Sequence, residues 1–154
     1  MSDCKVDFMQ IAMLLAQKAA DEGEVPVGAL VVQQGQIIGR GYNQRERCQN
    51  PLGHAEMIAI HEASQNLGSW RLTGCQLIVT LEPCPMCLGA AQQARIDEVI
   101  YGAQDKKGGA LSLGYRLHED TQFNHRFPVH HYPMAQCGEI LSQFFAQRRV
   151  KKSK

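Results

Sequence analysis

The sequence has almost no net charge and no long apolar run, and each absence excludes a class of protein. The 16 Lys and Arg residues nearly balance the 15 Asp and Glu residues, so the formal charge is +1 at pH 7. A chain so close to neutral exerts no broad attraction on a polyanion, and contact with nucleic acid must come from local clusters of basic residues. No apolar stretch approaches the roughly 18 residues of a membrane-spanning helix, so we expect no association with a membrane.

The six cysteines come without a segment that would direct them to an oxidising compartment. The chain begins MSDCKVDFMQ, which has no cationic start, apolar core or small-residue cleavage site. We therefore expect reduced thiols in a cytoplasmic protein. Four cysteines are isolated in the sequence, and each is expected to be buried as a small hydrophobic residue without a catalytic role: Cys4, Cys48, Cys75 and Cys137.

Internal repeats and linker-like segments are also lacking, so residues 1–154 are predicted to form one domain with a basic C-terminal tail. Hydrophobic spacing and turn residues predict helices at 6–22, 54–66, 85–94 and 138–150, the last with Phe144 and Phe145 inward, and strands at 27–32, 36–41, 76–81 and 97–102. This alternation favours an α/β fold with helices on both faces of the sheet. Residues 103–126 are the least regular, with one short helix expected at 111–117.

The motif Pro83-Cys84-Pro85-Met86-Cys87 places two thiols three positions apart at a helix start. Their side chains share one face, and the helix dipole favours thiolates, so the pair can chelate one soft metal ion. Sulfur ligands indicate zinc rather than magnesium or calcium. A structural zinc site would need a second pair of ligands at similar spacing, but the sequence has no second CxxC. The alternative to metal binding is a redox CxxC, which would require neither the flanking prolines nor a distant His-Ala-Glu.

The third ligand is expected to be His54, in the sequence His54-Ala55-Glu56 at the start of a predicted helix. His61 is a rival, but seven helical residues separate it from His54 by about 10 Å, so both cannot bind one ion. Residues two apart in a helix diverge by about 200°, so His54 and Glu56 converge only if His54 lies at an irregular helix entrance. Pro51 and Gly53 permit this.

Three protein ligands leave one zinc position for a water, whose pKa falls toward about 7. Glu56, beside that water without being a ligand, can take its proton, deliver it to a ring nitrogen and protonate a departing amine. The non-catalytic alternatives are a structural role for His54 and a solvated carboxylate at the helix start for Glu56. The paired motifs favour the catalytic interpretation, with one zinc per chain.

The two motifs, thirty residues apart, resemble the signature of the cytidine deaminase-like superfamily. The chain is most similar to the bacterial-type tRNA adenosine deaminases of that superfamily. The stretches that carry this resemblance are Glu24-Val25-Pro26-Val27-Gly28-Ala29, Gly41-Tyr42-Asn43, Val79-Thr80-Leu81-Glu82-Pro83-Cys84, Tyr101-Gly102-Ala103, Phe123-Asn124-His125-Arg126 and Phe144-Phe145. The resemblance implies a three-layer α/β/α fold with a central mixed sheet of about five strands. It implies conversion of adenosine to inosine at the first anticodon position of tRNA.

The resemblance also implies roles for residues outside the zinc site. Asn43 would hydrogen-bond the flipped base, and Val27, Leu81 and Ala55 would line its pocket. Contacts with the anticodon stem-loop would come from Asp105, Lys106, Asn124, His125, Arg126, Phe145, Arg148 and Arg149, and the enzyme would be a homodimer. The family commonly has Asp-Pro-Thr-Ala before His-Ala-Glu, whereas this chain has Asn50-Pro51-Leu52-Gly53. This departure concerns the loop that contacts RNA rather than the zinc chemistry.

Alternatives stay open at this point for both the surface and the function. The basic residues near positions 106 and 148–152 are equally typical of an ordinary solvated surface, and residues 124–126 are compatible with a structural turn. The same metal chemistry would serve a deaminase of free guanine, cytosine or cytidine, because pocket shape and flanking contacts select the substrate. A zinc-stabilised RNA-binding module without activity is a third hypothesis.

Overall fold

The computed structural model describes residues 2–152 and contains one five-stranded mixed sheet. Its strands are β1 (Gly28–Gln33), β2 (Gln36–Tyr42), β3 (Cys75–Leu81), β4 (Glu98–Ala103) and β5 (Val129–His131), in the order β2-β1-β3-β4-β5. β1 pairs antiparallel with both β2 and β3, whereas β3, β4 and β5 run parallel. The crossover from β3 through α3 to β4 therefore brings the C-terminal ends of these two strands to the same end of the sheet.

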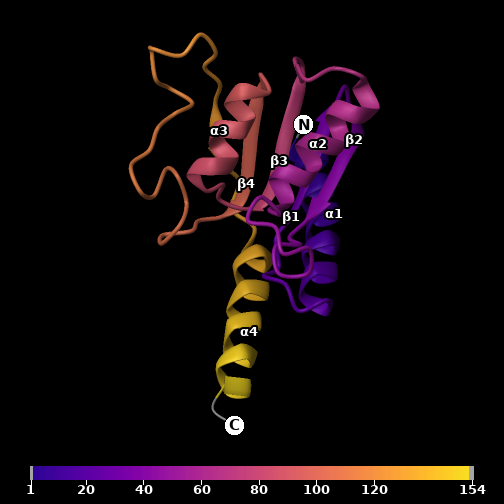
Figure 1. Ribbon diagram of the computed structural model, residues 1–154, viewed down its shortest axis with the longest axis vertical. Coiled ribbons are helices and arrows are strands. Elements are labelled where there is room, and N and C mark those ends of the chain that lie inside the picture. The colour runs from indigo at the N-terminus through magenta and orange to yellow at the C-terminus, as the bar shows by residue number, and fades with distance from the viewer. Residues whose placement is uncertain (1, 153–154) are drawn as a thin grey trace.

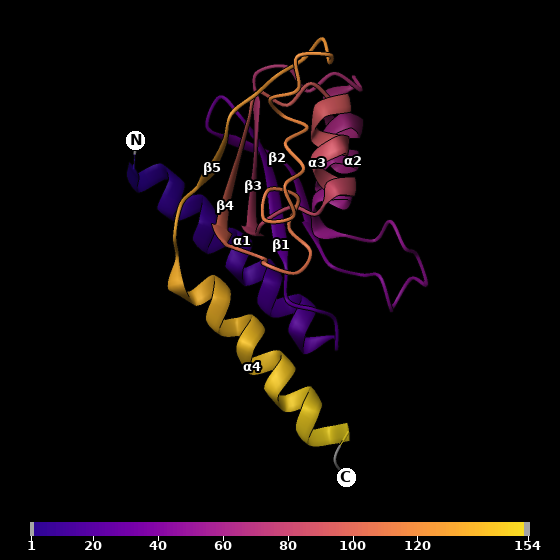
Figure 2. The same ribbon diagram turned by 90° about the vertical axis from the view of Figure 1, so that its left-hand side faces the viewer.

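Four helices cover the sheet in two layers: α1 (Ser2–Asp21) and α4 (Ala135–Lys152) lie on one face, and α2 (Ala55–Leu67) and α3 (Pro85–Gln93) lie on the other (Figures 1 and 2). The strand sequences explain both layers, because successive side chains point to opposite faces. Val31 packs in the core beneath α2 and α3, whereas Leu30 packs with Met9 beneath α1. The predicted three-layer architecture with a mixed five-stranded sheet is thus confirmed.

Helix α2 approaches β2 very closely, and two glycines make this approach possible. A Cβ on Gly39 would collide with the Ala59 carbonyl oxygen, and one on Gly41 would collide with the Ala55 carbonyl oxygen. Any side chain at these strand positions would push α2 off the sheet. Since the first turn of α2 carries the His-Ala-Glu motif, these glycines fix the height of that motif above the sheet.

The structure differs from the sequence expectations at several elements. α1 begins at Ser2 and α4 at Ala135, both earlier than expected, and β5 was missed. Residues 153–154 of the predicted basic tail lie outside the described residues, whereas residues 151–152 complete α4. Among the described residues, no helix combines the length and apolar character needed to cross a membrane.

The short helix expected at 111–117 is wrong, because the segment forms turns. Gly114 adopts a left-handed φ of 88°, and the Ala110 N–H donates to the Pro83 carbonyl rather than to a helical partner. The inward orientation of Phe145 is also wrong, since its side chain is 41% exposed; α4 buries only Cys137 and Ile140. Cys4 and Cys48 are exposed rather than buried, whereas Cys75 and Cys137 are buried as expected.

Candidate active site

The histidine of the His-Ala-Glu motif lies just outside helix α2. His54 is the N-cap residue, with an extended backbone at φ −82° and ψ 147°, and its N–H donates to the Leu52 carbonyl oxygen at 2.8 Å. A side chain at Gly53 would be crowded, since its Cβ would lie 3.0 Å from the Asn50 carbonyl oxygen. The irregular helix entrance that the sequence required is therefore present, and the His54 and Glu56 side chains line the same cavity.

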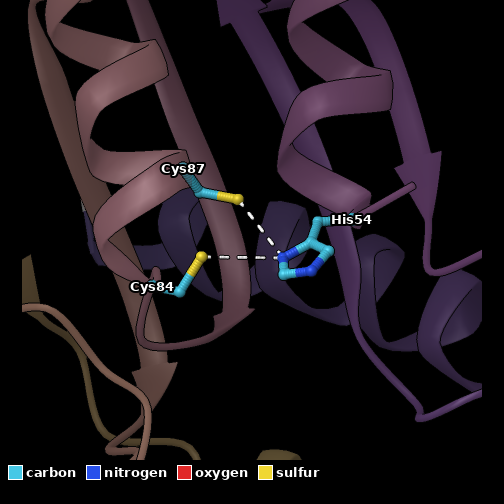
Figure 3. A group of neighbouring side chains, drawn as sticks. All are labelled: His54, Cys84 and Cys87. Carbon is cyan, nitrogen blue, oxygen red and sulfur yellow. Dashed lines mark hydrogen bonds between the residues drawn. The ribbon is translucent and has the colours of Figure 1, made fainter. Parts of the chain in front are cut away.

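The two cysteines occupy the corresponding position on helix α3. Cys84 is its N-cap residue, Pro85 its first helical residue, and Cys87 lies fully buried in its first turn. The Sγ atoms of Cys84 and Cys87 each lie 3.6 Å from His54 Nδ1, as Figure 3 shows. His54, Cys84 and Cys87 thus offer three donor atoms that all lie within 4.8 Å of one another.

This donor set fits zinc in both chemistry and spacing. Tetrahedral zinc with ordinary Zn–S and Zn–N bond lengths would hold a sulfur and a nitrogen about 3.6 Å apart. The two observed sulfur–nitrogen separations of 3.6 Å match this value. His61, the rival ligand, is exposed on α2 and is not part of the converging group.

The two thiols have opposite acidities. A hydrogen bond from Cys87, supported by one from His54, lowers the pKa of Cys84 to about 4. The same hydrogen bond and burial raise the pKa of Cys87. The hydrogen bond with Cys84 also raises the pKa of His54. In the absence of metal, the pair therefore holds one thiolate on Cys84 and one proton on Cys87, and a soft cation would displace that proton.

Glu56 is a buried carboxyl beside the three donors. Its side chain is 4% exposed, in the first turn of α2. Burial raises its pKa to about 7, and the nearby Cys84 charge adds to this rise. A carboxyl that titrates near neutrality can both accept and return a proton, which is what general acid–base catalysis requires.

A cavity of about 200 Å³ opens onto this group. It is smaller than the roughly 300–1,000 Å³ typical of pockets for drug-sized ligands, and so suits a single heterocycle. The residues that line it are Val25, Val27, Asn43, Arg45, His54, Ala55, Glu56, Leu81, Glu82, Cys84 and Asp105. Sequence reasoning missed Val25, Arg45 and Glu82. Val25 and Glu82 lie inside stretches that carry the family resemblance, whereas nothing in the sequence singles out Arg45.

The other residues expected to contact RNA do not line the cavity. Lys106 is exposed beside Asp105, and Asn124 and Arg126 are exposed in the segment before β5. His125 has structural contacts, because its Nε2 lies 2.6 Å from the Ile96 carbonyl oxygen and its ring stacks on Phe127. The remaining three, Phe145, Arg148 and Arg149, lie on α4, which extends beyond the sheet (Figure 1).

Comparison with known proteins agrees with this geometry. Residues 2–103 match the family model described as the cytidine and deoxycytidylate deaminase zinc-binding region. A tRNA-specific adenosine deaminase of Bacillus subtilis (strain 168) is 46% identical over 146 residues, covering 94% of this chain and 91% of the relative.

Two solved structures share the fold over most of their length. One, from a study of A-to-I editing by tRNA:A34 deaminases at the wobble position of transfer RNA, has a TM-score of 0.83 and 40% identity, covering 88% of this chain and 99% of its own. A guanine deaminase from Bacillus subtilis has a TM-score of 0.62 and 32% identity, covering 93% and 92%. The chain belongs to the zinc-binding cytidine and deoxycytidylate deaminase family and, within it, to the tRNA-specific adenosine deaminases.

Proposed function

We propose that this protein hydrolyses the exocyclic C–N bond of adenosine at the first anticodon position of a tRNA, producing inosine and ammonia. The observation that carries the proposal is a cavity the size of one base in which a buried carboxyl, Glu56, adjoins three converging zinc donors. The 46% sequence identity to a tRNA-specific adenosine deaminase over 94% of this chain supports adenosine as the substrate.

His54, Cys84 and Cys87 would hold the zinc. Bound by three protein ligands, zinc supplies Lewis acidity that lowers the pKa of water from about 16 toward 7. Glu56 takes the proton of the attacking water and delivers it to a ring nitrogen while a C–O bond forms at C6. It then takes the remaining proton from the new C6 hydroxyl and delivers it to the exocyclic amine, so that the C6 carbonyl forms as the C–N bond breaks and ammonia leaves. Burial, which raises the pKa of this carboxyl in the metal-free site, also favours return of the proton to the substrate.

Asn43 is held in an orientation that leaves part of its amide for the base. Its Nδ2 donates to the Val25 carbonyl oxygen at 3.3 Å, and its Oδ1 accepts the Arg45 N–H at 3.3 Å. An amide has two donors and two acceptor sites, so one of each remains available in the cavity lining. Val27, Leu81 and Ala55 supply apolar contact with the ring.

The anticodon stem-loop would be held by the exposed residues beyond the cavity. Lys106, Asn124 and Arg126 are solvent-facing, as are Arg148 and Arg149 on α4, and basic side chains there would meet phosphates. His125 belongs to this set by family resemblance only, since its ring is engaged in structural contacts. We also propose a cytoplasmic location, which a tRNA substrate supports.

A second copy of the chain is part of the proposal. Several large apolar side chains are exposed on the loops before α2 and after β4, namely Leu52, Leu113 and Tyr115. Exposed apolar surface of this kind is typical of interaction sites. Light scattering coupled to gel filtration, with and without stem-loop RNA, measures the oligomeric state; a monomer in both conditions would exclude the dimer.

The experiment that tests the substrate compares two activities of the zinc-loaded protein. Inosine formation on a synthetic anticodon stem-loop containing A at the first anticodon position is measured against ammonia release from guanine, cytosine and cytidine. We expect activity on the stem-loop alone. Activity only on free bases would instead indicate the chemistry of the guanine deaminase relative. Activity on neither substrate would favour the hypothesis of a zinc-stabilised RNA-binding module.

A further inference from the structure

The cavity is bordered by two loops that are far apart in the sequence, and each loop is anchored by a buried carboxylate that the proposed chemistry does not use. Glu24 is 1% exposed and Glu82 is 2% exposed. Glu24 directly precedes Val25, which lines the cavity, and Glu82, itself part of the lining, follows β3. Burying a carboxylate is costly unless its oxygens accept hydrogen bonds, so the partners of these two groups indicate their role.

Glu24 binds the backbone of the loop at residues 43–53. Its Oε1 accepts the Glu46 N–H at 3.1 Å and its Oε2 accepts the Arg47 N–H at 2.6 Å. The same loop begins with Asn43 and Arg45, which line the cavity, and it ends at His54. Glu24 thereby fixes one wall of the cavity across more than twenty residues of sequence.

Glu82 binds the loop at residues 104–114 in the same way. Its Oε1 accepts the Asp105 N–H at 3.2 Å and the Ser112 hydroxyl at 2.7 Å, and its Oε2 accepts the Ser112 N–H at 2.9 Å. The loop folds tightly around this carboxylate, because a Cβ on Gly109 would collide with Oε2. The part of the cavity lining that includes Asp105 therefore takes its shape from Glu82.

We propose that Glu24 and Glu82 are positioning residues that hold the two cavity-lining loops in place and so determine how tightly the substrate is bound. Charge-assisted hydrogen bonds to backbone N–H groups are about twice as strong as neutral ones, which makes these carboxylates rigid anchors on loops that have little secondary structure. The reacting groups His54, Cys84, Cys87 and Glu56 lie at the starts of α2 and α3. They lie outside the backbone positions that Glu24 and Glu82 bind, which are residues 46 and 47 for Glu24 and residues 105 and 112 for Glu82.

Glutamine at either position keeps the shape of the side chain but removes one acceptor. At Glu82, an amide nitrogen in place of Oε1 would face the Asp105 N–H, and in place of Oε2 it would face the Ser112 N–H. At Glu24, either orientation leaves the Glu46 or the Arg47 N–H opposite an NH2 group. Each substitution therefore costs at least one loop hydrogen bond without leaving a cavity in the core.

The test compares Glu24→Gln and Glu82→Gln with the control Glu62→Gln. Glu62 also accepts a backbone N–H, from Arg40 at 3.3 Å, but it is exposed and does not line the cavity. Ser112→Ala, which removes only the hydroxyl donor to Glu82, is the milder variant should Glu82→Gln fail to fold. Zinc content, amide hydrogen exchange and steady-state kinetics are measured for each protein.

We expect Glu82→Gln to speed exchange of the Asp105 and Ser112 amides by about tenfold, and Glu24→Gln to do the same for the Glu46 and Arg47 amides. KM for the stem-loop should rise about tenfold while kcat changes by less than about threefold, with one zinc retained. Glu62→Gln should change neither the exchange rates of these loop amides nor KM. Unchanged exchange and KM would overturn the proposal, as would a loss confined to kcat.

The KM comparison rests on the proposed function, whereas the exchange comparison does not. If the parent protein deaminates a free base instead of the stem-loop, the proposed substrate is wrong, and KM is measured on that base. If the parent acts on the stem-loop but the loop amides of the two variants exchange at the parent rate, the positioning role alone is wrong.

Discussion

His54 and Glu56 face the same cavity although they are only two positions apart in the sequence. The reason is that His54 is an extended N-cap residue, whereas Glu56 is in the first turn of α2, so the helical rotation between them does not apply. This relationship gives the site a ligand and a proton carrier from three consecutive residues. It also means that the two roles can be separated by mutation.

Glu56→Ala should lower turnover by roughly 100- to 10,000-fold, because the proton transfers would lose their carrier. Zinc content should stay at about one ion per chain, since the glutamate is not among the converging donors. Metal analysis and single-turnover kinetics measure the two quantities. Loss of the metal together with activity would show that Glu56 is a ligand rather than a proton carrier.

Zinc uptake by the metal-free protein should release protons near neutral pH. The pKa of Cys84 is lowered to about 4, so this thiol is already ionised, whereas Cys87, whose pKa is raised, gives up about one proton on binding. Zinc affinity should therefore increase with pH. Calorimetry in buffers of different ionisation enthalpy counts the protons, and zinc uptake without any proton release would contradict the assignment.

Gly41→Ala should destabilise the protein by about 2 kcal/mol or more, because its Cβ would overlap the Ala55 carbonyl oxygen and force α2 away from β2. Zinc affinity should fall as well, since His54 moves with α2. Gly138→Ala is the matched control: its Cβ meets nothing within 4 Å in α4, so it should stabilise the protein by about 0.5–1 kcal/mol. Urea unfolding measures both changes.

His118 should make stability depend on pH. Its ring is 3% exposed, its Nδ1 has no hydrogen-bond partner among the described residues, and burial lowers its pKa from the ordinary value of 6.5. The unfolded chain then binds the proton more readily, so the free energy of unfolding falls as pH drops below about 6.5 toward the lower folded pKa.

His118→Phe removes this titration and keeps an aromatic ring beside Phe127. We expect its advantage over the parent in the free energy of unfolding to be greater at pH 5 than at pH 7, in zinc-saturated protein. His61→Gln, at an exposed position, is the control. An equal difference at both pH values would show that the His118 pKa is not lowered.

The sequence predicted the elements whose signals are local. Hydrophobic spacing located α1 and α2, and the adjacent prolines and cysteines marked the start of α3, so all three metal donors could be identified from the sequence alone. β5 could not be found this way, because its three residues are paired on one side only and two of them are exposed histidines. Its position depends on β4 rather than on its own sequence.

The loop at residues 104–114 shows the same limit at the candidate site. Its conformation depends on hydrogen bonds to Glu82, which lies more than twenty residues away, and no periodicity in the loop reports such a contact. The short helix expected at 111–117 was therefore wrong, because local sequence cannot report these distant hydrogen bonds. Arg45 was missed similarly, since it lines the cavity from a loop whose backbone is hydrogen-bonded to the distant Glu24.

The three donor atoms belong to residues 54, 84 and 87, so an ion held by them closes a ring of thirty residues that runs through α2 and β3. Such a closure acts on the unfolded chain as a cross-link does, restricting its freedom, and it fastens the first turns of α2 and α3 together on one side of the sheet. The metal ion that the proposed reaction needs would thus also stabilise the fold. We expect the melting temperature and the turnover to fall together when the metal is removed.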